Sequence, residues 1–175
     1  MATRPHTLIV LVEDHPGVLN RVMSLFRQRG FNADSVAVGH AETAGVSRMT
    51  FVVNGDDKQI EQMTKQLYKL LEVLKVTDIT GENAIQRELA LIKVAASDRT
   101  RADIMRVVTD IYRGRFVDAT QDSLTIEVTG PTDKIESLLA MIRPYGIKEV
   151  ARTGAVAMAR GANSNGLTLL RDQVA

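Results

Sequence analysis

The spacing of hydrophobic residues changes several times along the chain, and each change predicts an element boundary. Thr7–Val12 is an unbroken apolar and β-branched run, which predicts a buried strand. Beyond Pro16 the hydrophobic residues follow a helical spacing that ends at Gly30, a usual residue just after a helix. The inward positions of this helix are Val18, Leu19, Val22, Met23 and Phe26. We therefore expect a strand followed directly by an amphipathic helix.

The next segments complete one folding unit. Phe31–Val38 and Ser47–Val53 alternate between apolar and polar residues, which predicts two strands that pair as a hairpin. The pair Asp56-Asp57 opens a second helix, and Val73–Ile79 is a last strand. The order β-α-β-β-α-β is that of a ferredoxin-like unit. The inward positions of the second helix are Ile60, Met63, Leu67, Leu70 and Leu71.

The second half of the chain repeats this order. The letters FVVNGDDKQIEQ are matched by IEVTGPTDKIES, with Gly55 opposite Gly130 and Ile60 opposite Ile135. Its long first helix should turn four residues inward, namely Ile104, Val107, Val108 and Ile111. The expected elements are the strand Leu89–Ala95, the helix Asp98–Tyr112, the strands Arg115–Thr120 and Leu124–Thr129, the helix Asp133–Arg143 and the strand Ile147–Ala151.

The repeat predicts an α+β fold of two tandem ferredoxin-like βαββαβ domains. We expect the first domain at residues 1–82 and the second at residues 83–161. Residues 162–175 contain a stretch rich in small and polar residues, which predicts a tail.

Composition and charge narrow the classes of function. The 22 lysine and arginine residues nearly balance 21 aspartate and glutamate residues, so charge favours neither nucleic acid nor membrane as a partner. The absence of cysteine excludes disulfides and thiolate sites and fits a cytoplasmic location. The apolar run near the N-terminus is too short for a signal sequence or a membrane span.

The loop after the first strand, VEDHPGV, contains two acids and a histidine. A catalytic interpretation of Glu13, Asp14 and His15 is weak, because consecutive side chains of an extended segment point apart. The chain contains no GxSxG, P-loop or GxGxxG motif, and its three histidines share no ligand spacing. We expect neither a catalytic residue nor a metal ligand, and we expect Ser47 to be an exposed strand residue.

RNA binding is a minor alternative, because ferredoxin-like sheets also build RNA-recognition modules. Those modules stack bases on aromatic residues of the central strands. Here Phe51 is the single aromatic residue in the expected central strands.

The same loop is better suited to binding a small anion with its backbone. Pro16 fits the first helical position, and Gly17 leaves space at the helix start. The first N–H groups of a helix have no partner inside it, and the helix dipole favours negative charge there. A free amino acid would place its carboxylate near Gly17 and Val18 and its ammonium against Asp14. The alternative is that Asp14 or His15 only caps the helix.

Asn32 stands at the entry to the second strand, where an apolar or β-branched residue is usual. Alone, it is more often a turn residue. In a side-by-side dimer, however, the start of this strand in one chain can approach the helix N-terminus of the other. The amide of Asn32 would then bridge to a ligand between them.

These segments together resemble a known family. The pattern ExxPGVLxRVxxLFxxRGFN, from Glu13 to Asn32, is similar to the opening of the small regulatory subunit of acetohydroxyacid synthase (acetolactate synthase), whose N-terminal half is an ACT domain. The resemblance continues through SRMTFVV, QIEQMTKQLYKLLEVLKV, RELALIKV and ARTGAVAMARG. It covers nearly the whole chain and leaves out only the tail.

The resemblance implies a regulatory subunit with no active site and no cofactor of its own. Its partner would be the large catalytic subunit, which carries thiamine diphosphate, Mg and FAD and condenses two pyruvates, or pyruvate with 2-oxobutyrate. The small subunit would activate this partner and make it sensitive to valine or a related branched-chain amino acid. A free-standing ACT-type amino-acid sensor for another enzyme or regulator is the alternative.

The resemblance also implies where the effector binds, between paired ACT domains of a homodimer. The family often has asparagine at the position of Asp14, so this chain offers the effector a formal charge in place of an amide. The implied effector-binding residues are Asp14, His15, Pro16, Gly17, Val18, Leu19, Asn32 and Ala33.

Overall fold

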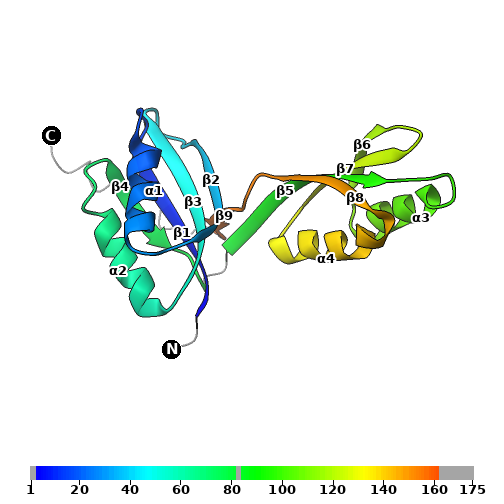
Figure 1. Ribbon diagram of the computed structural model, residues 1–175. Helices are drawn as coiled ribbons and strands as arrows, with labels where there is room; N and C mark the ends of the chain where they lie inside the picture. The colour runs from blue at the N-terminus through cyan, green and yellow to red at the C-terminus, as the bar shows by residue number, and fades with distance from the viewer. Residues whose placement is uncertain (1–2, 82–83, 162–175) are drawn as a thin grey trace. The chain divides into compact units, whose positions relative to one another are not determined.

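The computed structural model describes residues 3–81 and 84–161 (Figure 1). The chain divides into two compact units, which we call the first and second unit. The first unit contains the residues up to Ile85 and those from Val156 onward, and the second contains Gln86–Ala155. The expected domain boundary between residues 82 and 83 and the expected tail at residues 162–175 lie outside the described residues.

The first unit is a four-stranded antiparallel sheet with two helices on one face (Figure 1). The strand order is β2-β3-β1-β4. This arrangement confirms the predicted βαββαβ order. The elements are β1 (Arg4–Glu13), α1 (Val18–Gln28), β2 (Ala33–His40), β3 (Val46–Gly55), α2 (Asp57–Leu67) and β4 (Val73–Asp78).

The helices bury one face of this sheet. Leu8, Val10 and Val12 alternate along β1 and join the core, because every second side chain of a strand points to the same face. Phe26 of α1 stacks on Phe51 of β3 with ring centroids 4.7 Å apart. Both rings are almost fully buried, and burying each is worth about 1.5–3 kcal/mol.

Helix α2 begins as predicted but ends early. Asp56 accepts a hydrogen bond from the Gln59 N–H, and the Gln59 side chain accepts one from the Asp56 N–H, which together form a capping box. The chain leaves the helix after Leu67 through backbone hydrogen bonds between residues three apart, which tighten its last turn. Leu71 therefore lies beyond the helix and is 78% exposed, so its expected inward position is wrong. No glycine or proline marks this stop in the sequence.

Tyr68 closes one outer edge of the sheet. Its hydroxyl accepts a hydrogen bond from the Val76 N–H at 3.0 Å and donates one to the Val76 carbonyl at 3.1 Å. The β4 backbone is therefore occupied at this point and cannot pair there with a further strand. Strand β2 forms the other edge and pairs only with β3 within the described residues.

Replacing Tyr68 by phenylalanine is expected to lower the free energy of unfolding by about 1 kcal/mol, because both backbone groups of Val76 lose a partner. Urea denaturation measures this change. Tyr145→Phe is the control, since that hydroxyl has no hydrogen-bond partner among the described residues. Equal stability of both variants would show that water replaces the Tyr68 hydroxyl without cost.

The second unit repeats the first, with the strand order β6-β7-β5-β8 and helices on one face of the sheet (Figure 1). A short further strand, β9 (Val156–Ala159), pairs with β5, although its residues belong to the first unit, and was not predicted. The elements are β5 (Ala84–Ala95), α3 (Arg101–Arg106) with a π-helical turn (Val107–Ile111), β6 (Arg115–Ala119), β7 (Ser123–Gly130), α4 (Thr132–Ile142) with a 3-10 turn (Arg143–Tyr145), and β8 (Ile147–Arg152).

The π-helical turn after α3 changes which side chains face the core. A π-turn holds an extra residue, so later side chains rotate away from the positions that an α-helix gives them. Ile111 is consequently 62% exposed, which contradicts its expected inward position. Tyr112 is buried in its place, and its hydroxyl lies 2.7 Å from Ser137 Oγ.

An ion pair fastens the end of β8 to β5. Glu88 is only 4% exposed, and its two carboxylate oxygens accept hydrogen bonds from Nε and Nη2 of Arg152. Arg152 Nη1 also donates to Glu136 at 2.5 Å, and Thr132 Oγ1 donates to Glu88 at 3.2 Å. The Arg152 guanidinium lowers the pKa of Glu88, and the Glu88 carboxylate raises the pKa of Arg152.

Candidate functional site

The loop between β1 and α1 is held in place by its backbone. The Glu13 N–H donates to the Glu72 carbonyl at 2.9 Å, and the Asp14 N–H donates to the Gly45 carbonyl at 2.8 Å. The carboxylate of Glu72 pairs with Arg21 on α1, which adds a side-chain contact between the helix and the start of β4. The loop therefore has a fixed path up to Asp14.

Gly17, and not Pro16, stands at the junction of loop and helix. Helix α1 begins at Val18, and Gly17 is its N-cap with a φ of 91°. Pro16 lies in the turn before it, so its expected place at the first helical position is wrong. The left-handed backbone of Gly17 would strain any residue with a side chain. A Cβ at Gly17 would meet nothing within 4 Å, so the space beside the helix start is open.

No side chain caps this helix, so the capping alternative for Asp14 and His15 is wrong. Asp14 instead accepts a hydrogen bond from Ser47 Oγ at 3.1 Å and lies 3.1 Å from His40 Nδ1. His15 pairs with Glu13 at 3.2 Å. Within the described part of the chain, the N–H groups of Gly17, Leu19 and Asn20 have no hydrogen-bond partner. Helix α1 thus presents free N–H donors at its positive end.

Ser47 and His40 contact Asp14, and the sequence did not indicate either as part of the candidate site. Both lie in the same cross-strand row as Val12, on the face of the sheet that carries the helices. Ser47 is only 6% exposed, which corrects the expected exposed position. The pairing register of the strands would have indicated Ser47, because Val12 lies near the end of β1 and Ser47 is its direct partner on β3.

Asp14 combines a negative charge with an open approach. Its side chain is 39% exposed, and that of His40 is 86% exposed. The carboxylate and the free N–H groups of α1 belong to the same short loop, which thus carries the two kinds of group that a zwitterion requires. Its ammonium would meet Asp14, and its carboxylate would meet the helix N-terminus.

Asn32 and Ala33 are not brought to this loop within one chain. Ala33 pairs with Val53 at one end of β3, whereas His40 pairs with Ser47 at the other end. The eight residues of β2 separate the two groups by roughly 25 Å. Asn32 is exposed, and its side chain has no partner among the described residues.

The loop after β5 in the second unit has the same backbone hydrogen bonds as the loop after β1 but different side chains. The Ala95 N–H donates to the Gly146 carbonyl and the Ala96 N–H to the Asp122 carbonyl, as Glu13 and Asp14 do in the first unit. Ala96 therefore stands in the place of Asp14 and offers no charge. The Thr100 hydroxyl accepts a hydrogen bond from the N–H of Ser97 at 3.0 Å. This loop therefore has no carboxylate at the position of Asp14.

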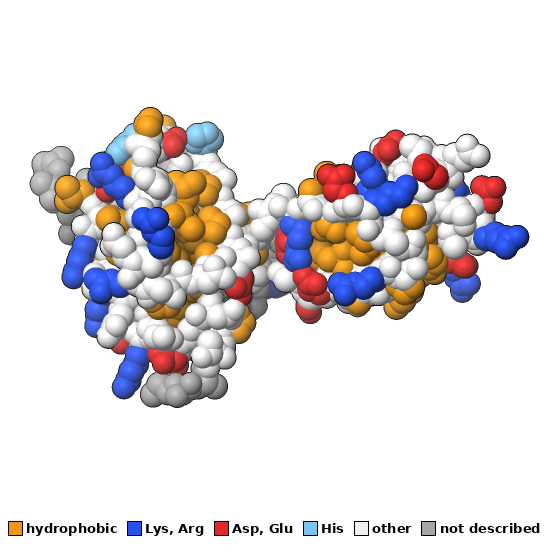
Figure 2. All heavy atoms as spheres, viewed as in Figure 1, with side chains coloured by type: hydrophobic (Ala, Val, Ile, Leu, Met, Phe, Trp, Pro, Cys, Tyr) orange, Lys and Arg blue, Asp and Glu red, His pale blue; other side chains and the backbone are white. Residues whose placement is uncertain are grey.

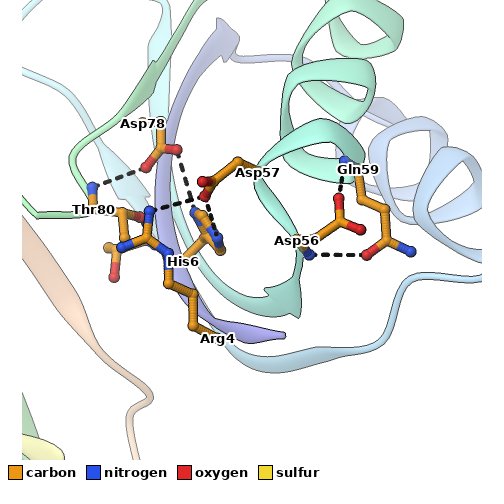
Figure 3. A network of polar contacts seen from close by, with 8 residues as sticks. Arg4, His6, Asp56, Asp57, Gln59, Asp78 and Thr80 are labelled. Atoms are coloured by element: carbon orange, nitrogen blue, oxygen red, sulfur yellow. Dashed lines mark hydrogen bonds and ion pairs between the residues drawn. The ribbon is translucent and has the colours of Figure 1, made fainter. Parts of the chain in front are cut away.

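A second polar cluster joins the start of β1 to α2 and β4 (Figure 3). His6 is buried, with Asp78 3.4 Å from its Nδ1 and Asp57 3.6 Å from its Nε2. Arg4 donates to Asp57 at 2.8 Å and lowers the pKa of that carboxyl. Thr80 donates its N–H to Asp78 at 2.8 Å. Among the described residues, no three His, Cys, Asp or Glu side chains are arranged to hold a metal ion.

The features that RNA-binding sheets use for base stacking are not available at the surface of the central strands. Phe51, the aromatic residue on the central strands, is fully buried and cannot stack on a base. Acidic and basic side chains are interspersed on the visible face of the second unit (Figure 2). No helix in the described part of the chain is long and apolar enough to span a membrane.

Comparison with known proteins accounts for both halves of the chain. A family model for the ACT domain of small subunits of acetohydroxyacid synthase matches residues 8–75, and one for the small subunit of acetolactate synthase matches residues 87–161. A probable acetolactate synthase small subunit of Archaeoglobus fulgidus is 54% identical over 156 residues, which cover 89% of this chain and 97% of that protein.

Two further relatives extend the agreement. The acetolactate synthase small subunit of Mycolicibacterium smegmatis is 51% identical, with 94% of this chain and 96% of that protein covered. The crystal structure of the small subunit from Thermotoga maritima has a TM-score of 0.84 at 44% identity, and the match covers 90% of this chain and 98% of that one. The chain belongs to the acetolactate synthase small subunit family.

Proposed function

We propose that two copies of this regulatory subunit bind valine, or a related branched-chain amino acid, between their ACT domains. Binding makes the catalytic large subunit subject to feedback inhibition, and the small subunit activates that partner when no effector is bound. The observation that supports this most directly is that one short loop carries both the Asp14 carboxylate and the free N–H groups at the start of α1.

The loop fits an α-amino acid of modest size. The effector carboxylate accepts hydrogen bonds from the helix N-terminus near Gly17, Val18 and Leu19, and its ammonium pairs with Asp14. Burying a valine side chain contributes about 1.5–3 kcal/mol, and the helix end contributes about 1 kcal/mol. After the cost of association, an affinity between millimolar and tens of micromolar is expected, about −4 to −6 kcal/mol.

The edges of the sheet support a dimer through β2. Tyr68 occupies the backbone of β4 at the opposite edge, whereas β2 pairs only with β3 within the described residues. Two β2 strands running antiparallel would bring the start of one strand beside the end of the other. Asn32 and Ala33 of one chain would then lie near Asp14 and His15 of its mate.

Feedback requires that the effector bind better to the assembly in which the large subunit is less active. By reciprocity, the large subunit then changes effector affinity by the same factor. Thiamine diphosphate, Mg and FAD belong to the large subunit in this scheme, and the small subunit binds none of them. The holoenzyme is expected to act in the cytoplasm.

Calorimetric titration with valine, with and without the separately purified large subunit, tests the proposal. We expect saturation at one valine per chain, because the loop of the second unit lacks a counterpart of Asp14. Acetolactate formation should rise on adding the small subunit and fall again with valine. Absence of both valine heat and stimulation would reject the proposal, and valine heat without stimulation would favour a free-standing sensor.

Replacing Ser47 by alanine tests how Asp14 is positioned. The carboxylate loses the hydrogen bond from Ser47 Oγ, so valine affinity should fall about three- to tenfold, because such a bond contributes about 1 kcal/mol. Calorimetry measures the affinity, with Ser97→Ala in the loop of the second unit as the matched control. Unchanged affinity would show that Asp14 needs no support from β3.

A further inference from the structure

Strand β9 lies on the face of the first-unit sheet that the helices leave uncovered. Ala157 is 6% exposed and packs with Ile9 and Ile79 in a small apolar cluster. Ile9 alternates with Leu8 and Val10, whose side chains face the helices, so this cluster lies on the opposite face. The neighbours of Ala157 on β9 are exposed, as expected for a short strand with one side against the sheet.

Arg48 fastens β9 to this face. Its Nη2 donates to the Ala157 carbonyl at 2.7 Å, within the range of a charge-assisted hydrogen bond. Burial lowers the pKa of the Arg48 guanidinium, and the carboxylate of Glu42 acts in the opposite direction. An arginine remains charged under these conditions, so the cost of its partial burial is offset by the contact with β9.

The residue before Arg48 holds the effector loop. Ser47 pairs with Val12 on the helix side and donates to Asp14, while Arg48 pairs with Leu11 on the other side and donates to β9. Two adjacent residues of β3 therefore contact the loop and β9 from opposite faces of the sheet. A small shift of this end of β3 would move both contacts together.

Strand β9 is connected to the second unit by a short stretch of chain. Thr153–Ala155 separate it from Arg152, which is bound to the buried Glu88. The Thr153 N–H donates to the Leu89 carbonyl, and its hydroxyl accepts from the Leu89 N–H, both at 3.1 Å. The residues directly before β9 are thus anchored to β5, and only Gly154 and Ala155 lie between Thr153 and β9 in the sequence.

We propose that Arg48 is a positioning residue that couples effector binding in the first unit to the second unit through β9. The inference rests on the proposed function, since it describes how occupancy of the Asp14 loop is passed on. Effector binding shifts the start of β3, and the Arg48 contact transmits this shift to Ala157 and along the chain to Thr153. Without the contact, the effector still binds, but the large subunit is no longer inhibited.

Arg48→Gln tests the coupling, with Arg27→Gln as the matched control, because Arg27 is exposed on α1 and has no side-chain partner among the described residues. In the small subunit alone, hydrogen exchange of the Val156–Ala159 amides should accelerate about tenfold in Arg48→Gln and stay unchanged in the control. The valine dissociation constant should stay within about threefold of the parent value in both variants.

With the large subunit present, the concentration of valine for half-inhibition should rise at least about tenfold in Arg48→Gln, while activation without valine is retained. A second pair avoids relying on one substitution. Ala157→Asp places a charge in the buried cluster and should uncouple in the same way, whereas Met158→Asp, at an exposed position, should not.

Four outcomes would overturn the coupling. Normal inhibition of Arg48→Gln by valine, or unchanged amide exchange in β9, shows that the contact transmits nothing. Loss of valine binding in parallel with inhibition shows that Arg48 serves the effector site itself. Failure of the parent chain to bind valine would overturn the proposed function as well, and accelerated β9 exchange in Arg48→Gln would then show only that the contact holds β9.

Discussion

Gly17→Asp should abolish feedback inhibition while leaving activation of the large subunit intact. The new carboxylate points into the open space beside the helix start and repels the effector carboxylate. At about 4 Å, like charges near a protein surface cost about 1–4 kcal/mol, so the valine concentration for half-inhibition should rise about 5- to 850-fold. The readout is acetolactate formation by the reconstituted holoenzyme as a function of valine concentration.

The control for this variant must reproduce its backbone strain. Gly17 has a φ of 91°, so any side chain there costs about 1–2 kcal/mol of folding stability. Gly81→Asp has the same kind of strain, with a φ of 76° and open surroundings, and lies outside the loop. It should keep normal feedback. Equal loss of activation and inhibition in Gly17→Asp would show that the loop serves the fold and not the effector.

The repeated folding unit could be predicted from the sequence because its elements carry strong periodic patterns. The unbroken apolar run Thr7–Val12 and the helical spacing from Val18 to Phe26 were enough to identify the first strand and helix. The exact ends of elements depend on weaker forces. The exit of α2 after Leu67 and the π-turn after α3 arise from local backbone bonds, which leave no periodic signal.

The sequence indicated only part of the candidate site, because the rest depends on how the strands pair. Gly17 and Asp14 could be proposed from the sequence, because a Pro-Gly step lies shortly after an acidic residue at the end of a strand. Ser47 and His40 become neighbours of Asp14 only through the register of β3 with β1 and β2. Strand β9 was missed because VAMA is too short and too rich in small residues to distinguish a strand from a linker.

Arg152→Met should lower the free energy of unfolding by about 3 kcal/mol, which is more than we expect for Tyr68→Phe or Gly17→Asp. Glu88 is 4% exposed, and without Arg152 its charge retains only the hydrogen bond from Thr132 among the described residues. Breaking a buried pair from one side costs about 3–5 kcal/mol, and the partial exposure of Arg152 places the effect at the lower end. Denaturant unfolding near pH 7 measures the loss.

The exposed pair Arg115 and Glu127 provides the control. The Arg115 side chain is 80% exposed, so Arg115→Met should cost less than about 1 kcal/mol although it also removes an ion pair. The double substitution Glu88→Met with Arg152→Met should recover most of the loss, because it leaves no buried charge without a partner. A double variant as unstable as Arg152→Met alone would assign the loss to packing.

The loss in Arg152→Met should also depend on pH in one direction. Arg152 holds the pKa of Glu88 below its usual value in the folded chain, so the pair stabilises the fold above the unfolded pKa of glutamate, about 4.3. This contribution disappears as the pH falls through the folded pKa, because protonated Glu88 no longer needs a cation. The stability difference between parent and Arg152→Met should therefore be full at pH 7 and shrink below about pH 4. A difference that stayed constant down to pH 3 would mean that the charge of Glu88 does not cause the loss.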